Sequence, residues 1–275
     1  MLLAIAFGLA ACTQEDAGDG ATVNPDGPLT SFGPGVWIVG VDIEPGTYRS
    51  SGGGPFCIWE RLSGFGRSSN ETIVGEVAIY GEIQTVTIMA DDAGFSAEPA
   101  CGTWSPAPTM GPKATEFGPG VWMIGVDIAP GRYRSSGEGC FWGRLSGFGG
   151  TPSESVGSSI NDGIQTVDIA ATDVGFSSLD GCGSWSPAPT FGPRATDFGP
   201  GVWVVGLDIV PGTYRYSGGD DCFWARLSAF DGSFDAMIDV GGGEPSQPVT
   251  IDATDAGFAA DTFCGMWSLD PAFQS

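Results

Sequence analysis

The chain is organised by one stretch, Phe32-Gly-Pro-Gly-Val-Trp-Ile-Val-Gly-Val-Asp-Ile-Glu-Pro-Gly-Thr-Tyr-Arg49, which returns almost letter for letter at 117–134 and 198–215. The sequence therefore repeats one module of roughly 80 residues. We expect three modules, at residues 32–112, 117–193 and 198–275. Because each module carries a full set of expected strands and its own cysteine pair, we expect beads on a string rather than one closed three-fold body.

The residue pattern of each module predicts β-structure. Between residues 36 and 43, every second residue from Trp37 to Ile43 is apolar while Asp42 points the other way, which is typical of a strand with one buried face. Pro45 and Gly46 then predict a type II turn into a return strand. We count about six short strands per module. The expected fold is all-β, with three tandem modules that are small antiparallel sandwiches or partly open barrels.

Composition excludes several classes of function. The chain has 33 acidic and 10 basic residues, a net charge of −23, and no histidine. That charge repels nucleic acid, so no nucleic-acid partner is expected. The lack of histidine removes Ser-His and Cys-His catalysis as well as the commonest metal ligand. We expect neither a cofactor nor a metal ion.

The first residues resemble a bacterial lipoprotein signal. A short apolar run ends in Leu9-Ala10-Ala11-Cys12, which is similar to the lipobox whose cysteine is lipidated after cleavage. No Lys or Arg precedes the run, which favours a true start upstream of Met1. The resemblance implies that residues 1–12 are a signal peptide ending at the lipidated Cys12, and that the protein is anchored to the membrane outside the cytoplasm. Residues 13–31 are acidic and almost free of large apolar side chains, which predicts a disordered tether.

The other six cysteines recur as one pair per module. The pairs are Cys57 and Cys101, Cys140 and Cys182, and Cys222 and Cys264. Outside the cytoplasm, a pair that recurs at a nearly constant separation indicates a disulfide. A zinc site is the poorer interpretation, because two cysteines without a histidine or a CxxC pair leave the ion short of ligands. We therefore expect one stabilising disulfide in each small module.

In each module a tryptophan and an arginine follow the first cysteine, two residues apart and thus on one face of a strand. These ligand-binding candidates are Trp59 and Arg61, Trp142 and Arg144, and Trp224 and Arg226. An indole beside a guanidinium can stack on a sugar ring or a peptide while the guanidinium holds a carboxylate or hydroxyl. The structural alternative, which we favour, is an arginine stacked on the tryptophan and paired with a neighbouring acid, Asp42, Asp127 or Asp208.

Other interpretations find less support. An Asp-x-Gly-Phe sequence begins at Asp92, Asp173 and Asp255. It indicates an Asx-type turn, since a calcium loop needs more spaced carboxylates. A glycosidase needs two carboxylates, but Glu60, beside the first Trp–Arg pair, is not acidic in the other modules. A spacer holds a passenger domain, and none follows Ser275 in this sequence, so we expect the modules themselves to act and no residue to be catalytic.

Several motifs together resemble a tandem repeat of secreted proteins and lipoproteins of bacteria, notably actinobacteria. They are G-x-D-I-x-P-G-x-Y-R, C-x-W-x-R-L-S-x-F, D-x-G-F and C-G-x-W, and they cover residues 32–275. This family is functionally uncharacterised. The resemblance therefore implies location and module identity, and it assigns no catalytic or binding residue.

These observations predict a surface-anchored lipoprotein whose three non-catalytic modules bind an extracellular ligand at several weak sites at once. The expected partners are the membrane, through the lipid anchor, and a cell-envelope polysaccharide or surface protein. One alternative is a structural envelope component or protein-docking spacer with no small ligand. An envelope-acting hydrolase is the less favoured alternative.

Overall fold

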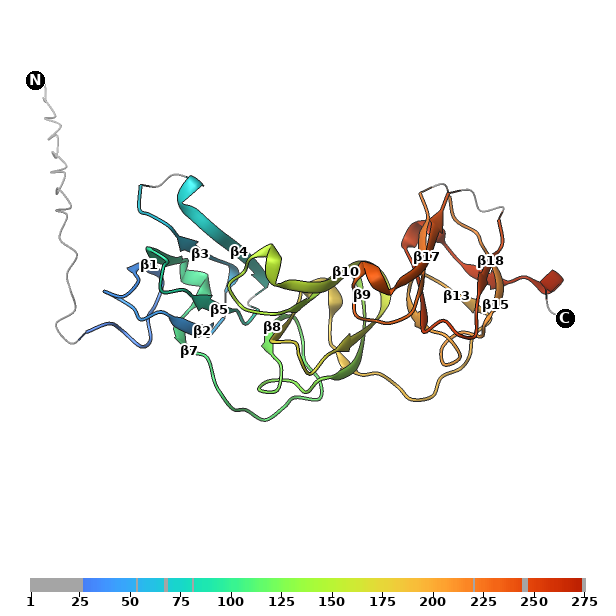
Figure 1. The fold of residues 1–275 in the computed structure, drawn as a ribbon, viewed down its shortest axis with the longest axis horizontal. Helices are drawn as coiled ribbons and strands as arrows, with labels where there is room; N and C mark the ends of the chain where they lie inside the picture. The colour runs from blue at the N-terminus through green and yellow to red at the C-terminus, as the bar shows by residue number, and fades with distance from the viewer. Residues whose placement is uncertain are drawn as a thin grey trace, which may run out of the picture.

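Three modules follow one another along the long axis of the molecule (Figure 1). The computed structural model describes residues 27–273, apart from 53, 67–68, 81, 220 and 244–246. Cys12, the apolar leader and residues 13–26 of the expected tether lie outside these residues. The end of the expected tether is ordered, because the Leu29 N–H donates to the Asp42 carbonyl at 2.8 Å and the Leu29 side chain packs against the core of the first module. Within the described part of the chain, no helix combines the length and apolar character needed to cross a membrane.

The first module is a sandwich of two sheets. One sheet has the strand order β1-β6-β3-β4 and the other β5-β2-β7, and the neighbouring strands run antiparallel. The strands are β1 (Gly35–Ile38), β2 (Gly46–Ser50), β3 (Pro55–Leu62), β4 (Thr72–Tyr80), β5 (Thr85–Ile88), β6 (Gly94–Ala97) and β7 (Trp104–Pro106). This confirms the all-β fold and, of the two expected architectures, the sandwich.

The second and third modules repeat this arrangement with longer or divided strands. The second contains β8 (Gly120–Met123), β9 (Gly131–Leu145), β10 (Ser155–Ile169), β11 (Gly175–Ser178) and β12 (Ser186–Pro187). The third contains β13 (Asp197–Phe198), β14 (Gly201–Val204), β15 (Gly212–Tyr216), β16 (Phe223–Leu227), β17 (Met237–Gly242), β18 (Val249–Ile251), β19 (Gly257–Ala260) and β20 (Trp267–Leu269). The long β9 pairs with β12 near one end and with β11 near the other, so it does the work of both β2 and β3.

The only helices in the described residues are single 3-10 turns. They are η1 (Ser69–Glu71), η2 (Pro99–Cys101), η3 (Pro152–Glu154), η4 (Asp180–Cys182), η5 (Phe234–Ala236), η6 (Thr262–Cys264) and η7 (Pro271–Phe273). Three of them end at the second cysteine of a module, so each expected disulfide ties a 3-10 turn to a strand or strand edge. The structure forms all three, Cys57–Cys101, Cys140–Cys182 and Cys222–Cys264.

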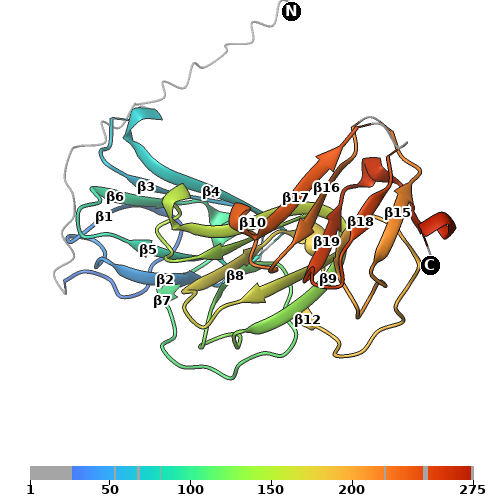
Figure 2. The same ribbon diagram turned by 45° about the vertical axis from the view of Figure 1, so that its right-hand side comes forward.

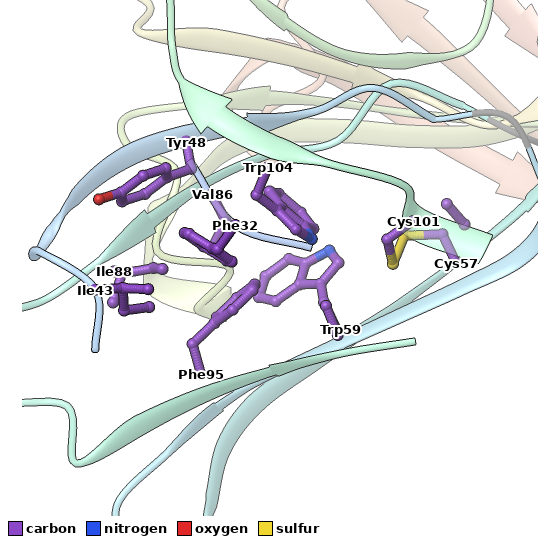
Figure 3. Close-up of a cluster of buried hydrophobic side chains, with 12 residues drawn as sticks. Phe32, Ile43, Tyr48, Cys57, Trp59, Val86, Ile88, Phe95, Cys101 and Trp104 are labelled. Carbon is purple, nitrogen blue, oxygen red and sulfur yellow. A yellow bond between two sulfur atoms is a disulfide. The ribbon is translucent and has the colours of Figure 1, made fainter. Parts of the chain in front are cut away.

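Aromatic rings fill the core between the sheets of each module. In Figure 3 the indole of Trp59 lies between Phe95 and Trp104, with the disulfide to one side. The ring centroid of Trp59 is 6.0 Å from that of Phe95 and 6.4 Å from that of Trp104. Equivalent rings pack in the other two modules. Three tryptophan-rich cores therefore stabilise three modules.

The first strand is shorter than its alternation predicts. Strand β1 ends at Ile38, because the Asp42 carboxylate accepts the Ile38 N–H at 2.9 Å and closes a turn. Gly40, with φ of +77°, supplies the left-handed conformation that this turn requires. Gly46 has φ of +159°, far from the roughly +80° that a type II turn requires there, and the chain turns at residues 40–42 instead of at Pro45 and Gly46.

The modules are not separate beads. Parallel bridges join Ile83 to Gly120 and Ile164 to Gly201, at the two boundaries between modules. Through the second bridge the sheets of the second and third modules become one sheet of nine strands. Figure 2 shows β9 and β10 of the second module next to β16, β17 and β19 of the third. The expectation of independent modules is wrong, because the edge of each following module pairs with the module before it.

Candidate functional site

Each candidate arginine forms an ion pair inside its own module. Nε and Nη2 of Arg61 donate to the two carboxylate oxygens of Asp92, both at 2.7 Å. The same pairing joins Arg144 to Asp173 and Arg226 to Asp255. Asp92 also accepts the N–H of Met89 at 2.8 Å and so closes a turn before β6, but this bond runs back along the chain and not forward as in the expected Asx-type turn. Hydrogen bonding to Asp92 raises the pKa of Arg61, which therefore stays charged.

The acids expected to pair with these arginines have other partners. Asp127 of the second module binds Arg49 of the first, with Nη1 and Oδ1 2.8 Å apart. Asp208 of the third module binds Arg134 of the second in the same way. These pairs connect modules, so the acids expected as partners of the candidate arginines are wrong, although each arginine is paired with an acid of its own module as expected. Strand alternation could not reveal them, because the partners lie more than seventy residues apart in the chain.

A loop of the following module covers the Trp–Arg face of the first two modules. We call it the Phe-x-Gly loop; it comprises Phe148-Gly149-Gly150 in the second module and Phe230-Asp231-Gly232 in the third. Nη1 of Arg61 donates to the Gly149 carbonyl at 2.8 Å, and Nη1 of Arg144 to that of Asp231 at 2.9 Å. The side chains of Trp59 and Trp142 are each only 2% exposed. Neither indole is accessible to a ligand.

Backbone and hydroxyl groups fix the same geometry at both joints between modules. At the first joint Thr87 N donates to Phe148 O and Thr85 Oγ1 donates to Val121 O. At the second joint Asp168 N donates to Phe230 O and Thr166 Oγ1 donates to Val202 O, and all four bonds are 2.7 to 3.0 Å long. Because the donors and acceptors occupy equivalent positions, one interface is used twice. The two equivalent interfaces therefore hold the three modules in a fixed row.

The third Trp–Arg pair faces an open cavity. Its volume is about 570 Å³, and its lining includes Tyr216, Trp224, Arg226, Asp239, Gly241 and Gln247. Smaller cavities of about 300 and 320 Å³ remain at the two joints. Trp224 is partly exposed, and within the described residues Nη1 of Arg226 has no hydrogen-bond partner. Of the three predicted pairs, this one alone is accessible in the described structure.

The cavity is not a plain copy of the covered faces. Four of its lining residues differ from their equivalents in the other two modules. Tyr216 replaces Ser50 and Ser135, and Pro248 replaces Thr85 and Thr166. Gly241 replaces Glu76 and Ser159, and Asp239 replaces Val74 and Gly157. Gly241 is required by packing, because a Cβ there would lie 2.4 Å from Cζ2 of Trp224. Sequence reasoning missed these residues, although each departs from the repeat at an otherwise similar position.

In the described part of the chain, one group of potential metal ligands comes together, and it is Cys222, Asp261 and Cys264. Asp261 lies beside Cys222 and Cys264, but these cysteines form a disulfide and offer no thiolate. The Asp261 carboxylate instead accepts the backbone N–H groups of Phe223 and Cys264, and so caps η6. The arrangement stabilises the disulfide turn rather than binding an ion.

Repeated β-sandwiches, each with a disulfide and joined by one recurring interface, define a tandem-module protein built for an oxidising compartment. The chain belongs to the Rv1352-like extracellular domain family, whose model matches residues 30–105, 114–186 and 195–268. This confirms the resemblance to an extracellular repeat family and an extracytoplasmic location. No curated protein and no solved structure matches the chain.

Proposed function

We propose that this protein is a non-catalytic binding protein of the bacterial cell envelope, anchored by a lipid on Cys12, whose ligand occupies the open cavity of the third module. One observation carries the proposal: the Trp–Arg faces of the first two modules are filled by Phe-x-Gly loops, whereas the third is open beside Trp224. The joints make the first two modules an arm that holds the third away from the membrane.

This proposal replaces three weak sites by one. Arg61 and Arg144 are 4% and 9% exposed, and the Nη1 atom of each is held by a loop carbonyl. Opening either face for a ligand would break the joint that covers it. While both interfaces between modules are intact, the chain offers one accessible Trp–Arg site. Simultaneous binding at several such sites of one chain therefore does not increase the affinity.

Among the described residues, the cavity lining does not hold the two carboxyl groups that hydrolysis of a glycan requires. Asp239 is the one carboxylate among its described lining residues. Asp255 is held by Arg226 and by the backbone N–H of Asp252, so it is committed to structure. Glycoside hydrolysis uses two carboxyl groups on opposite sides of the scissile bond. This supports binding without turnover.

Binding is tested with purified full-length protein and solubilised envelope material from the producing bacterium. We expect saturation at one site per chain and at least tenfold weaker binding by a variant combining Asp239→Asn with Gln247→Ala. Asp235→Asn, an exposed carboxylate of the same module outside the cavity lining, is the matched control and should bind normally. Saturation at three sites per chain, release of new reducing ends, or no binding by any fraction would contradict the proposal.

The anchor is tested separately. Cys12→Ser should release the protein from membranes into the soluble fraction, and mass spectrometry of the wild-type protein should find a diacylglyceryl group on Cys12. A membrane-bound Cys12→Ser protein would show that the anchor lies elsewhere.

A further inference from the structure

The lining of the third module's cavity combines aromatic surface with hydrogen-bonding groups. We infer that it binds a neutral saccharide. This inference rests on the proposed function and names the ligand class of the same site. Four properties of the described residues support it: the aromatic surface, the polar groups around it, the local charge, and the unsuitability of this face for another copy of the chain.

Two aromatic side chains supply the apolar part of the cavity. Trp224 lies on β16, and register places Gly241 of β17 directly opposite it. Since Gly241 has no side chain, the indole packs directly on its backbone, and it remains partly exposed in the cavity. Tyr216, which the other modules replace with serine, lines the same cavity. The C–H face of a sugar ring is apolar and matches such a surface, because aromatic rings bury much area at a small entropy cost.

Polar groups surround these rings and offer both donors and acceptors. The Asp239 carboxylate accepts, Nη1 of Arg226 donates, and the Gln247 amide does both. Gln84 and Gln165, the equivalents of Gln247, are 6% and 0% exposed, whereas Gln247 is exposed. A hydroxyl also donates and accepts, so a ring of hydroxyls suits this mixture better than a ligand with acceptors alone.

Local charge selects against an anionic ligand. Arg226 is the one basic residue among the described lining residues, and both Asp252 and Asp255 already neutralise it. Asp239 adds a further negative charge, and the whole chain carries a net charge of −23. A phosphate or carboxylate would therefore meet repulsion on approach and find no unneutralised cation in the cavity.

A second copy of the chain does not fit this face. To cover this face as the joints cover the other two, a second copy would have to insert the equivalent loop of its first module. That loop needs glycine at its last position, since Gly150 and Gly232 have φ of +78° and +71°. A Cβ at Gly232 would also lie 2.7 Å from Cη2 of Trp142. In the first module Arg67 occupies this position of the sequence. On the receiving side, Pro248 replaces the threonine whose hydroxyl bonds the next module.

The probes are neutral oligosaccharide fragments of a glucan, a mannan, a galactan and an arabinan, with a carboxymethylated glucan as the charged counterpart. Full-length protein is titrated with each, and binding is followed by calorimetry and tryptophan fluorescence. We expect at least one neutral fragment to bind, at least tenfold weaker binding after Asp239→Asn with Gln247→Ala, and no loss after Asp235→Asn. Trp224→Phe should remove most of the fluorescence change, because Trp224 is the one tryptophan that lines the described cavity.

Near-ultraviolet circular dichroism checks that each variant remains folded. Tighter binding of the carboxymethylated glucan than of every neutral fragment would overturn the inference. So would neutral binding that the cavity variants leave unchanged. If protease treatment of envelope material abolishes binding at this cavity, the proposed function stands but its ligand is a protein and the saccharide inference is wrong. If no envelope material binds, both fail.

Discussion

Gly232→Ala tests whether the Phe-x-Gly loop fixes the joint between the second and third modules. The residue has φ of +71°, where a side chain costs about 1–2 kcal/mol in strain. Its new Cβ would lie 2.7 Å from both Ser158 N and Cη2 of Trp142, and relieving such overpacking typically costs about 1–3 kcal/mol. Strain and overpacking together predict a loosened joint.

Gly206→Ala separates the two costs. Gly206 has φ of +76° but no atom within 4 Å of the position that a Cβ would take, so its variant carries the backbone strain alone. The difference between the two variants should therefore be about 1–3 kcal/mol at the joint, or roughly 5- to 150-fold in an opening equilibrium.

Amide hydrogen exchange measures this opening. The N–H groups of Ser158 and Asp168 donate across the joint to Gly232 O at 3.1 Å and to Phe230 O at 2.9 Å. We expect their protection to fall by the stated factor in Gly232→Ala relative to Gly206→Ala, while amides in the core of the first module are unaffected. Equal protection of Ser158 and Asp168 in the two variants would refute the role given to the loop.

Three further changes follow from the structure. Arg134→Met should lower the free energy of unfolding in urea by about 2–3 kcal/mol, because it breaks the ion pair with Asp208. The loss is smaller than is usual for a buried pair, since the Asp208 carboxylate still accepts the Val204 N–H. An unchanged unfolding midpoint would contradict this. Burial raises the pKa of the Glu82 carboxyl above its usual value. The contribution of the protonated carboxyl to the stability of the fold is therefore complete below that usual value and is lost as pH rises through the folded-state pKa. Glu82→Gln, which removes the charge, should raise the melting temperature at pH 7, and a lower melting temperature would argue against this. Replacing both cysteines of the Cys140–Cys182 disulfide with alanine should cost about 2–4 kcal/mol in thermal unfolding, whereas an equally stable variant would show that the core suffices.

Much of the fold was predictable because its signals are local or recur at fixed spacing. Alternation identified the strands, and the paired cysteines identified the disulfides. Alternation failed at residues 39–43, where the Asp42 side chain competes for the backbone N–H of Ile38. This hydrogen bond depends on the geometry of the turn, and the alternation of apolar residues between 37 and 43 gives no sign of it.

The candidate site was predictable in composition but not in exposure. The sequence places Trp59 and Trp224 in nearly identical local contexts, yet one is enclosed and the other lines a cavity. Gly241 and Asp239 were missed because cross-strand register, rather than chain position, brings them opposite Trp224 and Arg226. Their departure from the repeat was visible in the sequence, but its meaning required the register.

The sequence by itself determined the number of modules, their β-structure, their disulfides and the kinship with an extracellular family, because these depend on short patterns and covalent pairs. The tertiary structure alone decided that Arg49 reaches Asp127, that two Trp–Arg faces are closed, and that the third is open. The physical reason is that burial is a property of contacts between segments more than seventy residues apart, and identical local sequences carry no record of which neighbour covers them.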